Sequence, residues 1–149
     1  MAFEITATVS WGHLDANGHM ANTTYLDLSS DARFAYFSSQ GFTPAEFASL
    51  RIGPVVRRDE VEYVRELHLL QQIRVNYLLA GASDDASAFI VCNEIYRPDG
   101  KLAARVTSAA GWFDLVTRKL VVPPQALADA LLKLDRTENF QVLKSSVKK

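Results

Sequence analysis

The stretch VSWGHLDANGHMANTTY, residues 9–25, places a carboxylate, two imidazoles and an Asn-Gly turn directly before a predicted helix. Backbone N–H groups at the start of a helix lack intrahelical acceptors, and the aligned peptide dipoles add partial positive charge there. A polarised carbonyl group can therefore lie between the start of the helix and the carboxylate of Asp15. We take Asp15 as the candidate catalytic residue.

The segments on either side of this stretch predict a strand and a long helix. Residues 3–9 alternate apolar and polar side chains, which is the period of a half-buried strand. Asn22 is a good helix N-cap, apolar residues follow it at helical spacing, and Gly41 supplies a stop. The helix is apolar over much of its circumference and contains small residues. This pattern predicts a central helix with a sheet wrapped around it.

The remainder of the chain predicts an antiparallel meander, and hence an α+β fold. A short helix is expected at residues 44–50, and strand-like segments separated by turn signals continue to residue 122. A closing helix at residues 125–134 follows two prolines, and we expect a frayed polar tail from about residue 136. No internal repeat or linker divides the chain, so we expect residues 1–149 to form a single domain.

Composition excludes several classes of function. The chain has 149 residues, of which 48% are hydrophobic and 22% charged, and its formal net charge is -1. Without a basic excess, nucleic acid is not an expected partner. No apolar run approaches the roughly 18 residues that span a bilayer, and the first residues lack a signal-peptide pattern, so we expect a cytoplasmic protein without a membrane partner. The single cysteine, Cys92, is interpreted as a small buried strand residue.

Residues 11–25 resemble the motif of hotdog-fold thioesterases of the 4-hydroxybenzoyl-CoA thioesterase type, an aromatic residue followed by Asp-x-Asp-x-x-Gly-His-Val-Asn-Asn-x-x-Tyr. The resemblance covers about residues 3–130, and it extends to GPVVRRDEVEYVREL at 53–67 and GWFDLVTRK at 111–119. It implies a hotdog fold, in which an antiparallel sheet of five to six strands wraps around a long central helix.

The resemblance also implies a reaction. In this family the residue matching Asp15 is the catalytic carboxylate, acting as a nucleophile or as a base towards water. The backbone N–H groups of Asn22 and Thr23 would donate to the thioester carbonyl, while Gly18 and His19 would position the loop. The implied substrate is an acyl-CoA, no cofactor is needed, and the sites lie between protomers of a homodimer or homotetramer.

Three departures from the family pattern affect the loop and the choice of substrate. His13 stands where an acid is common, and Ala21 replaces the first Asn of the usual pair. Glu66 replaces a Pro, and the Leu70-Gln71 pair replaces a Gly-Asp that often bounds the next strand. Asp15 and the Gly-His pair after it are retained.

Each candidate residue also has a structural interpretation. Asp15 can be an N-cap or an Asx-turn residue. Its spacing with His13 and His19 resembles a metal-ligand pattern, but no second His or Cys cluster accompanies it and His68 is remote in sequence, so we expect no metal. His19 is expected to hold the loop through hydrogen bonds, and Asn22 to cap the helix.

Arginines and aromatic residues elsewhere stay outside the predicted site. Five arginines on predicted strands could meet CoA phosphates, but solvated faces and ion pairs explain them equally well: Arg57, Arg58, Arg65, Arg74 and Arg105. Six aromatic residues could shape an acyl pocket but are assigned to the core: Trp11, Tyr25, Tyr36, Phe37, Trp112 and Phe113.

The leading hypothesis is therefore an acyl-CoA thioesterase. A helix N-terminus favours the ionised carboxylate, which makes attack on the thioester or alignment of water more plausible than strong general-base catalysis. A non-catalytic acyl-CoA-binding hotdog protein, with Asp15 as a cap, is the alternative. A hotdog dehydratase or hydratase ranks last, because the longer motif of that chemistry is missing. Aromatic, short-chain and medium-chain acyl groups all remain open.

Overall fold

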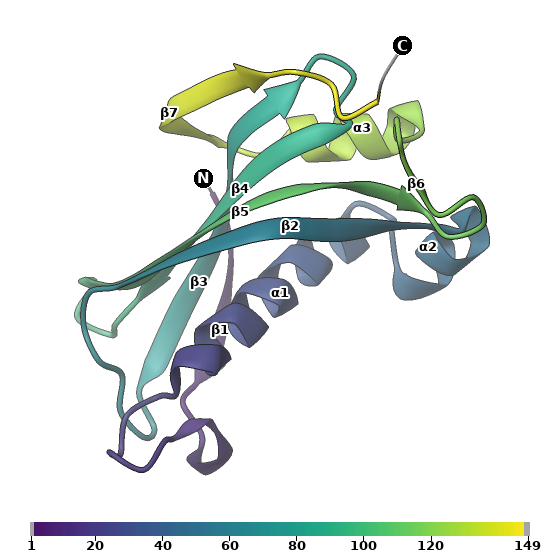
Figure 1. The fold of residues 1–149 in the computed structure, drawn as a ribbon. Coiled ribbons are helices and arrows are strands. Elements are labelled where there is room, and N and C mark those ends of the chain that lie inside the picture. Colours follow the sequence, from purple (N-terminus) through teal and green to yellow (C-terminus); the bar gives the residue numbers. More distant parts are fainter. Residues whose placement is uncertain (1, 148–149) are drawn as a thin grey trace.

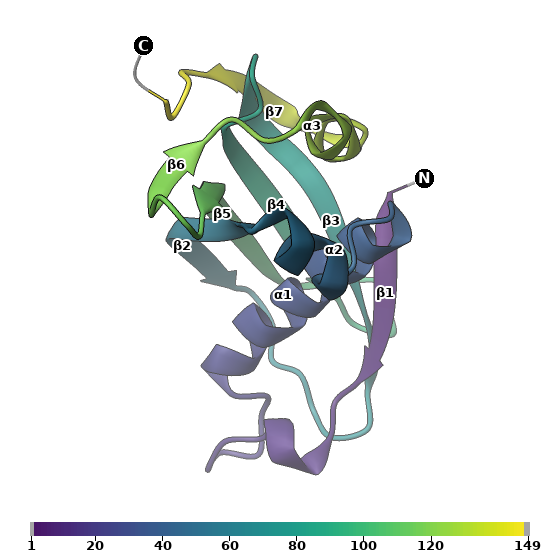
Figure 2. The same cartoon turned by 90° about the vertical axis from the view of Figure 1, so that its right-hand side faces the viewer.

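The computed structural model describes residues 2–147, in which a seven-stranded sheet wraps around the long helix α1 (Asn22–Ser39). Figures 1 and 2 show α1 lying along the inner face of the curved sheet. A short helix, α2 (Pro44–Leu50), follows it, and α3 (Gln125–Leu132) lies near the end of the chain. This architecture confirms the predicted α+β hotdog fold.

The main path of the sheet runs β1-β3-β4-β5-β2, and all neighbours on this path are antiparallel. Because β2 is the last strand of the path, it pairs only with β5 and its outer edge is free within residues 2–147. A β-bulge shifts the pairing of β2 with β5 between Val56 and Arg58. The bounds of these strands are β1 Phe3–Thr8, β2 Ile52–Tyr63, β3 Gln72–Ser83, β4 Ala88–Tyr96 and β5 Leu102–Asp114.

The core lies between α1 and the inner face of the sheet. Small residues of the helix allow this close approach, since Ser29 and Ala32 are completely buried. Aromatic residues fill the part of the core near the C-terminal end of α1, where Phe37 contacts Trp112 edge to face with ring centroids 5.6 Å apart. The predicted central helix is thus confirmed, and four of the six aromatic residues assigned to the core are buried: Tyr25, Tyr36, Phe37 and Trp112.

The predicted frayed tail is wrong for residues 136–143. This segment forms β7 (Arg136–Leu143), which pairs with β3 in parallel, while the short β6 (Lys119–Val121) pairs with β5. β7 lies on the edge of β3 beyond the part that β1 covers, and so protects hydrogen-bonding groups of an otherwise open edge. The sheet therefore has seven strands rather than five or six.

Three smaller predictions also need correction. Ala21 is the N-cap of α1 and Asn22 is its first helical residue, without a capping hydrogen bond from a side chain. Trp11 lies outside the core, because it belongs to a short 3-10 turn, η1 (Trp11–His13), and is 79% exposed. Phe113 is only partly buried. Within the described part of the chain, no helix is long and apolar enough to cross a membrane.

Candidate active site

The loop between β1 and α1 is held by a compact set of hydrogen bonds around Asp15. The N–H of Asp15 donates to the carbonyl of His19 over 2.8 Å, and Oδ1 of Asp15 accepts from the N–H groups of Asn17 at 2.8 Å and His19 at 3.3 Å. Gly18 has a φ of 80°, a conformation that glycine adopts without strain. Asp15 therefore shapes its own turn, as its structural interpretation predicted, and the same bonds fix the direction of its carboxylate.

A pocket of about 240 Å³ lies where this loop meets the start of α1, and we call it the helix pocket. Figure 1 shows the loop at the N-terminal end of α1. The carboxylate of Asp15 is solvent-exposed beside this pocket rather than buried in the core. The lining residues are Asp15, His19, Met20, Asn22, Tyr25, Tyr63, Val64, Arg65 and Glu66.

The first turn of α1 offers free hydrogen-bond donors beside this carboxylate. The N–H of Thr24 donates to the carbonyl of Ala21 over 3.0 Å, whereas the N–H groups of Asn22 and Thr23 have no acceptor among residues 2–147. Two unpaired N–H groups at the positive end of an 18-residue helix can stabilise a developing oxyanion. Asn22 lines the helix pocket, so the structure places one of the predicted donors in the same pocket as Asp15.

His19 positions the loop through both its backbone and its ring. Besides the two backbone contacts with Asp15, its Nε2 lies 3.0 Å from a carboxylate oxygen of Glu66. The ring of His68 packs edge to face on His19 with centroids 5.4 Å apart, and its Nε2 lies 3.5 Å from the other oxygen of Glu66. The structure thus brings His19 into contact with the Asp15 loop, its positioning role stays a prediction, and His68, remote in sequence, lies beside its ring.

Glu66, noted in the sequence only as a departure from the family pattern, is the second carboxylate of the helix pocket. It lies three residues beyond the end of β2, and the N–H of Met20 donates to the carbonyl of the adjacent Leu67 over 2.8 Å, which holds this segment against the loop. Contact between residues so far apart in sequence depends on the topology of the sheet. The only sequence signal was the replacement of Pro by an acidic residue at this position.

Two tyrosines form the wall of the helix pocket that faces β2. The rings of Tyr25 and Tyr63 meet edge to face with centroids 5.1 Å apart, and the hydroxyl of Tyr63 donates to the carbonyl of Asn22 over 3.0 Å. Burial, and then the charges of Tyr63, Asp15 and Glu66, raise the pKa of Tyr25 to about 12. Tyr25 therefore remains a neutral hydroxyl, suited to hydrogen bonding and packing but not to acting as a base.

His13 takes no part in the pocket. Its Nδ1 lies 3.0 Å from the N–H of Ser10, which donates to it, so the ring closes the turn that precedes the Asp15 loop. Among residues 2–147 no group of three His, Cys, Asp or Glu side chains is arranged to hold a metal ion.

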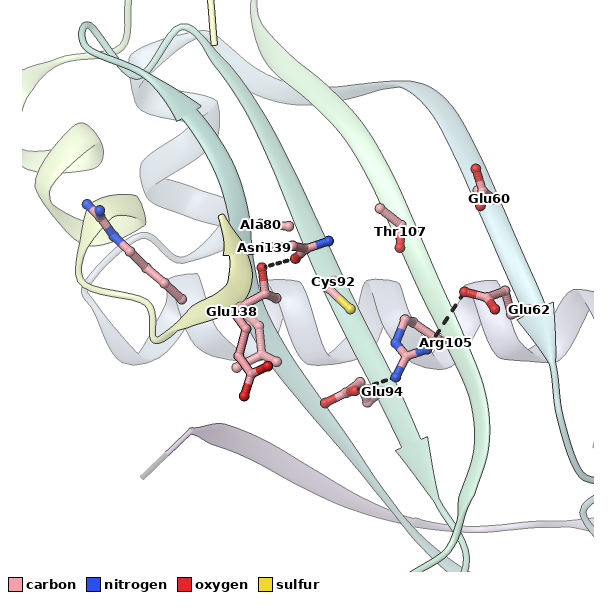
Figure 3. A pocket seen from close by; sticks show the side chains of 12 residues that line it. Glu60, Glu62, Ala80, Cys92, Glu94, Arg105, Thr107, Glu138 and Asn139 are labelled. Carbon is pink, nitrogen blue, oxygen red and sulfur yellow. Dashed lines mark hydrogen bonds and ion pairs between the residues drawn. The ribbon is translucent and has the colours of Figure 1, made fainter. Parts of the chain in front are cut away.

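A second, larger pocket of about 710 Å³ lies on the outer face of the sheet, and we call it the outer pocket. Figure 3 shows its side chains on β2, β3, β4 and β5, with β7 forming one wall. Arg105 lies between two carboxylates, 3.1 Å from Glu94 and 3.7 Å from Glu62. Burial and the charge of Glu94 raise the pKa of the Cys92 thiol to about 11, so this thiol stays protonated at neutral pH rather than forming the nucleophilic thiolate. This agrees with the prediction of a buried structural cysteine.

Three of the five arginines considered from the sequence make contacts within the described chain, whereas Arg57 and Arg58 line a separate surface pocket. Arg105 belongs to the outer pocket, and Arg74 pairs with Glu4 at 3.4 Å on the opposite edge of the sheet. Arg65 alone among the five lines the helix pocket, where its Nη1 donates to the carbonyl of Leu102 over 2.7 Å. Of the arginines considered from the sequence, Arg65 is therefore the one positioned to meet a ligand beside Asp15.

Comparison with known proteins identifies a family for this arrangement. The sequence model of the Thioesterase-like superfamily matches residues 9–131, a span that contains the whole helix pocket. No curated protein matches the chain significantly.

Several solved structures share the fold. A hypothetical protein from Staphylococcus aureus, solved in complex with CoA, has 21% identity, with 92% of this chain and 87% of that chain covered and a TM-score of 0.83. A 1,4-dihydroxy-2-naphthoyl-CoA thioesterase from Synechocystis has 19% identity, coverage of 92% and 100%, and a TM-score of 0.79. A DHNA-CoA thioesterase from Staphylococcus aureus has 19% identity, coverage of 87% and 88%, and a TM-score of 0.79. These similarities establish a common architecture.

Proposed function

Because the chain belongs to the thioesterase-like superfamily, a family of thioester hydrolases, we propose that it hydrolyses acyl-CoA with Asp15 as the catalytic carboxylate. The observation that carries the proposal is the juxtaposition at the helix pocket. A fixed, exposed carboxylate shares one small pocket with the first turn of a helix whose N–H groups are unpaired among residues 2–147. One side of the pocket supplies negative charge and the other supplies donors for a carbonyl oxygen.

The proposed reaction follows from the carboxylate on one side of the pocket and the N–H donors on the other. The thioester carbonyl oxygen accepts hydrogen bonds from the N–H groups of Asn22 and Thr23, which makes the carbonyl carbon more electrophilic. Asp15 then either attacks that carbon, expelling the CoA thiolate and forming an anhydride that water hydrolyses, or orients the water that attacks directly. In both routes water is consumed, and a carboxylic acid and free CoA leave. Because Oδ1 already accepts two N–H bonds, Oδ2 is the oxygen that faces the reaction.

His19 and Glu66 support this carboxylate without reacting. The ring of His19 is 3.0 Å from Glu66, and its backbone makes two hydrogen bonds with Asp15. Movement of Glu66 would therefore be transmitted to the loop that aims Asp15. We assign both side chains, together with Gly18, to positioning.

The active form is proposed to be a homo-oligomer in which the free edge of β2 meets a second copy. Within residues 2–147 this edge has no partner strand. Apolar side chains are exposed along it and just beyond its end, at Val56, Tyr63 and Val64, and Tyr63 also lines the helix pocket. A partner covering this edge would therefore also enclose the site. Light scattering on the purified protein gives the native mass, and a monomeric mass would contradict this part of the proposal.

The experiment that tests the reaction compares thiol release from aromatic and aliphatic acyl-CoAs by the wild type and by Asp15→Asn. Asparagine keeps an oxygen that can accept the two N–H bonds of the turn, so the fold should persist while the nucleophile is lost. Turnover by the wild type that collapses in a variant with unchanged thermal unfolding supports the proposal. Equal turnover by both proteins contradicts the role of Asp15.

The same panel tests the alternative of a binding protein. That alternative draws support from the fact that Asp15 closes its own turn, a role that requires no reaction. No thiol release from any acyl-CoA, combined with acyl-CoA binding measured by calorimetry, would establish an acyl-CoA-binding protein instead.

A further inference from the structure

A third cavity lies between the middle of α1 and the sheet, and its mostly apolar wall includes polar side chains. Its volume is about 100 Å³, several times the space that one water molecule requires. Most of its lining is apolar and comes from α1 and from four strands, but one arginine and one tyrosine also face it. The lining residues are Ser30, Arg33, Phe34, Phe37, Pro54, Val56, Tyr77, Phe89, Val91 and Ala110.

The guanidinium of Arg33 is fixed beside this cavity by two hydrogen bonds. Its Nε donates to Oδ1 of Asn93 over 3.0 Å, and its Nη2 donates to the hydroxyl of Ser108 over 2.7 Å. Ser108 in turn donates to the carboxylate of Asp59, and Asn93 donates to the carbonyl of Asn76. These contacts account for two of the three guanidinium nitrogens. Nη1 has no acceptor among residues 2–147.

Tyr77 presents a second free donor to the same cavity. Its side chain is 1% exposed, yet its hydroxyl has no hydrogen-bond partner within the described chain, unlike the hydroxyls of Tyr36, Tyr63 and Tyr96. Burial raises its pKa, so the hydroxyl keeps its proton and remains a donor. Neither donor is sealed off from solvent, because the only buried side-chain polar atom without a partner in the described chain is Nε of Arg97. Both donors therefore remain open to the cavity, where a ligand atom that accepts hydrogen bonds can meet them.

We propose that this cavity binds the distal end of the acyl group, and that Arg33 and Tyr77 select acyl groups carrying a hydrogen-bond acceptor oxygen there. The inference rests on the proposed thioesterase function. Nη1 of Arg33 can only donate, so the matching group is a hydroxyl, carbonyl or carboxylate oxygen. The charge of the guanidinium is already balanced through Ser108 by Asp59, so the site does not require an anion.

The position of Arg33 indicates the length of such a group. Arg33 follows Asn22 by 11 residues on α1, which places it about 16 Å along the helix axis from the proposed donor N–H groups. Side chains on a helix tilt towards its N-terminus, so the guanidinium lies closer to those donors than its backbone does. An acyl chain that reaches it within one protomer is therefore of medium length, on the order of ten carbons. A shorter aromatic group would reach the cavity only from the site of a neighbouring protomer. The rim residues Phe34 and Val56 are 46% and 44% exposed, so a second copy on the free edge of β2, as proposed above, would complete the wall.

The test measures a selectivity ratio rather than an absolute rate. For each protein, kcat/KM is determined for 10-hydroxydecanoyl-CoA against decanoyl-CoA, and for 4-hydroxybenzoyl-CoA against benzoyl-CoA. Tyr77→Phe removes one oxygen that has no protein partner, so the fold should be retained. Loss of one hydrogen bond to the substrate should lower the ratio by roughly three- to tenfold in the pair whose oxygen reaches the cavity.

Tyr96→Phe is the matched control. It removes the same oxygen from a tyrosine whose hydroxyl donates to Glu94 on the outer side of the sheet, so both ratios should equal those of the wild type. Ratios unchanged in Tyr77→Phe for both pairs would overturn the inference and leave a cavity filled by water.

Failure of the inference is distinguishable from failure of the proposed function. Turnover of decanoyl-CoA or benzoyl-CoA shows that the protein is a thioesterase, whatever the ratios are. If no thiol is released at all, the calorimetric affinities of 10-hydroxydecanoate and decanoate are compared instead. A preference for the hydroxylated acid that Tyr77→Phe abolishes supports the cavity assignment without catalysis, and equal affinities overturn it.

Discussion

The helix pocket and the outer pocket both contain carboxylates, but the partners of those carboxylates differ. In the outer pocket, Glu94 accepts hydrogen bonds from Asn76, Tyr96 and Arg105, so its charge is already neutralised. In the helix pocket, Asp15 accepts only two backbone N–H groups of its own turn, and free donors of α1 lie nearby. The outer pocket is larger, about 710 Å³ against about 240 Å³. We therefore base the proposed site on a carboxylate without a countercharge beside free donors, and not on the size of the pocket.

The largest expected effect is a loss of activity on substitution in the helix pocket that is not seen on substitution in the outer pocket. Asp15→Asn should lower kcat/KM for acyl-CoA by about 10²- to 10⁴-fold, since a positioned catalytic group contributes on that order. Glu94→Gln, the matched carboxylate-to-amide change in the outer pocket, should leave kcat/KM within about twofold of the wild type. Steady-state thiol release measures both. A comparable loss in both variants would mean that the outer pocket also takes part in turnover.

The next effect concerns stability and is confined to the outer pocket. β7 forms a wall of that pocket and runs beside Gly81 of β3 so closely that an added Cβ would lie 3.0 Å from the carbonyl oxygen of Gln141. Gly81→Ala should therefore lower the free energy of unfolding by about 1–3 kcal/mol through overpacking. Gly53→Ala is the control, since nothing lies within 4 Å of its added Cβ. Urea denaturation measures the free energy of unfolding of both variants. Equal values would show that β7 shifts to accommodate the added methyl group without loss of stability.

A smaller effect tests how the helix pocket is held together. Tyr63→Phe removes the hydroxyl that ties the end of β2 to the carbonyl of Asn22, at the first turn of α1. Losing one hydrogen bond of about 0.5–1.5 kcal/mol should reduce kcat/KM roughly two- to tenfold, because the donors of that turn are less well fixed. Tyr96→Phe, which loses a hydroxyl in contact with Glu94, should retain full activity. Unchanged activity in Tyr63→Phe would show that the rest of the structure fixes this turn.

The contrast between the pockets also shows what the sequence could predict. The helix pocket depends on a local segment, residues 9–25, so its Asp loop and helix start were predictable from turn and periodicity signals. Glu66 and His68 were not predictable as neighbours of His19, because sheet topology brings them there. β7 was missed for a similar reason: its polar pattern resembles a solvated tail, and only the open edge of β3 makes it a strand. The predicted cap at Asn22 failed because helix boundaries depend on loop contacts such as the bond from the Ala21 N–H to the carbonyl of His13.

The smallest expected effect is the contribution of Glu94, in the outer pocket, to the pH dependence of stability, which comparison with Glu94→Gln separates from that of other carboxyl groups. Burial opposes ionisation of Glu94, but hydrogen bonds from Asn76, Arg105 and Tyr96 outweigh it and hold the pKa below its usual range. A carboxyl whose pKa is lower in the folded state stabilises the protein above its unfolded-state pKa, and that stability is lost as pH falls through the folded-state value. The free energy of unfolding of the wild type, measured in urea between pH 7 and pH 3, should therefore fall more steeply with acid than that of Glu94→Gln. The difference between the two proteins should shrink as Glu94 becomes protonated. Parallel curves would mean that Glu94 has the same pKa in the folded and unfolded states. That result would contradict the neutralisation of its charge by Asn76, Tyr96 and Arg105.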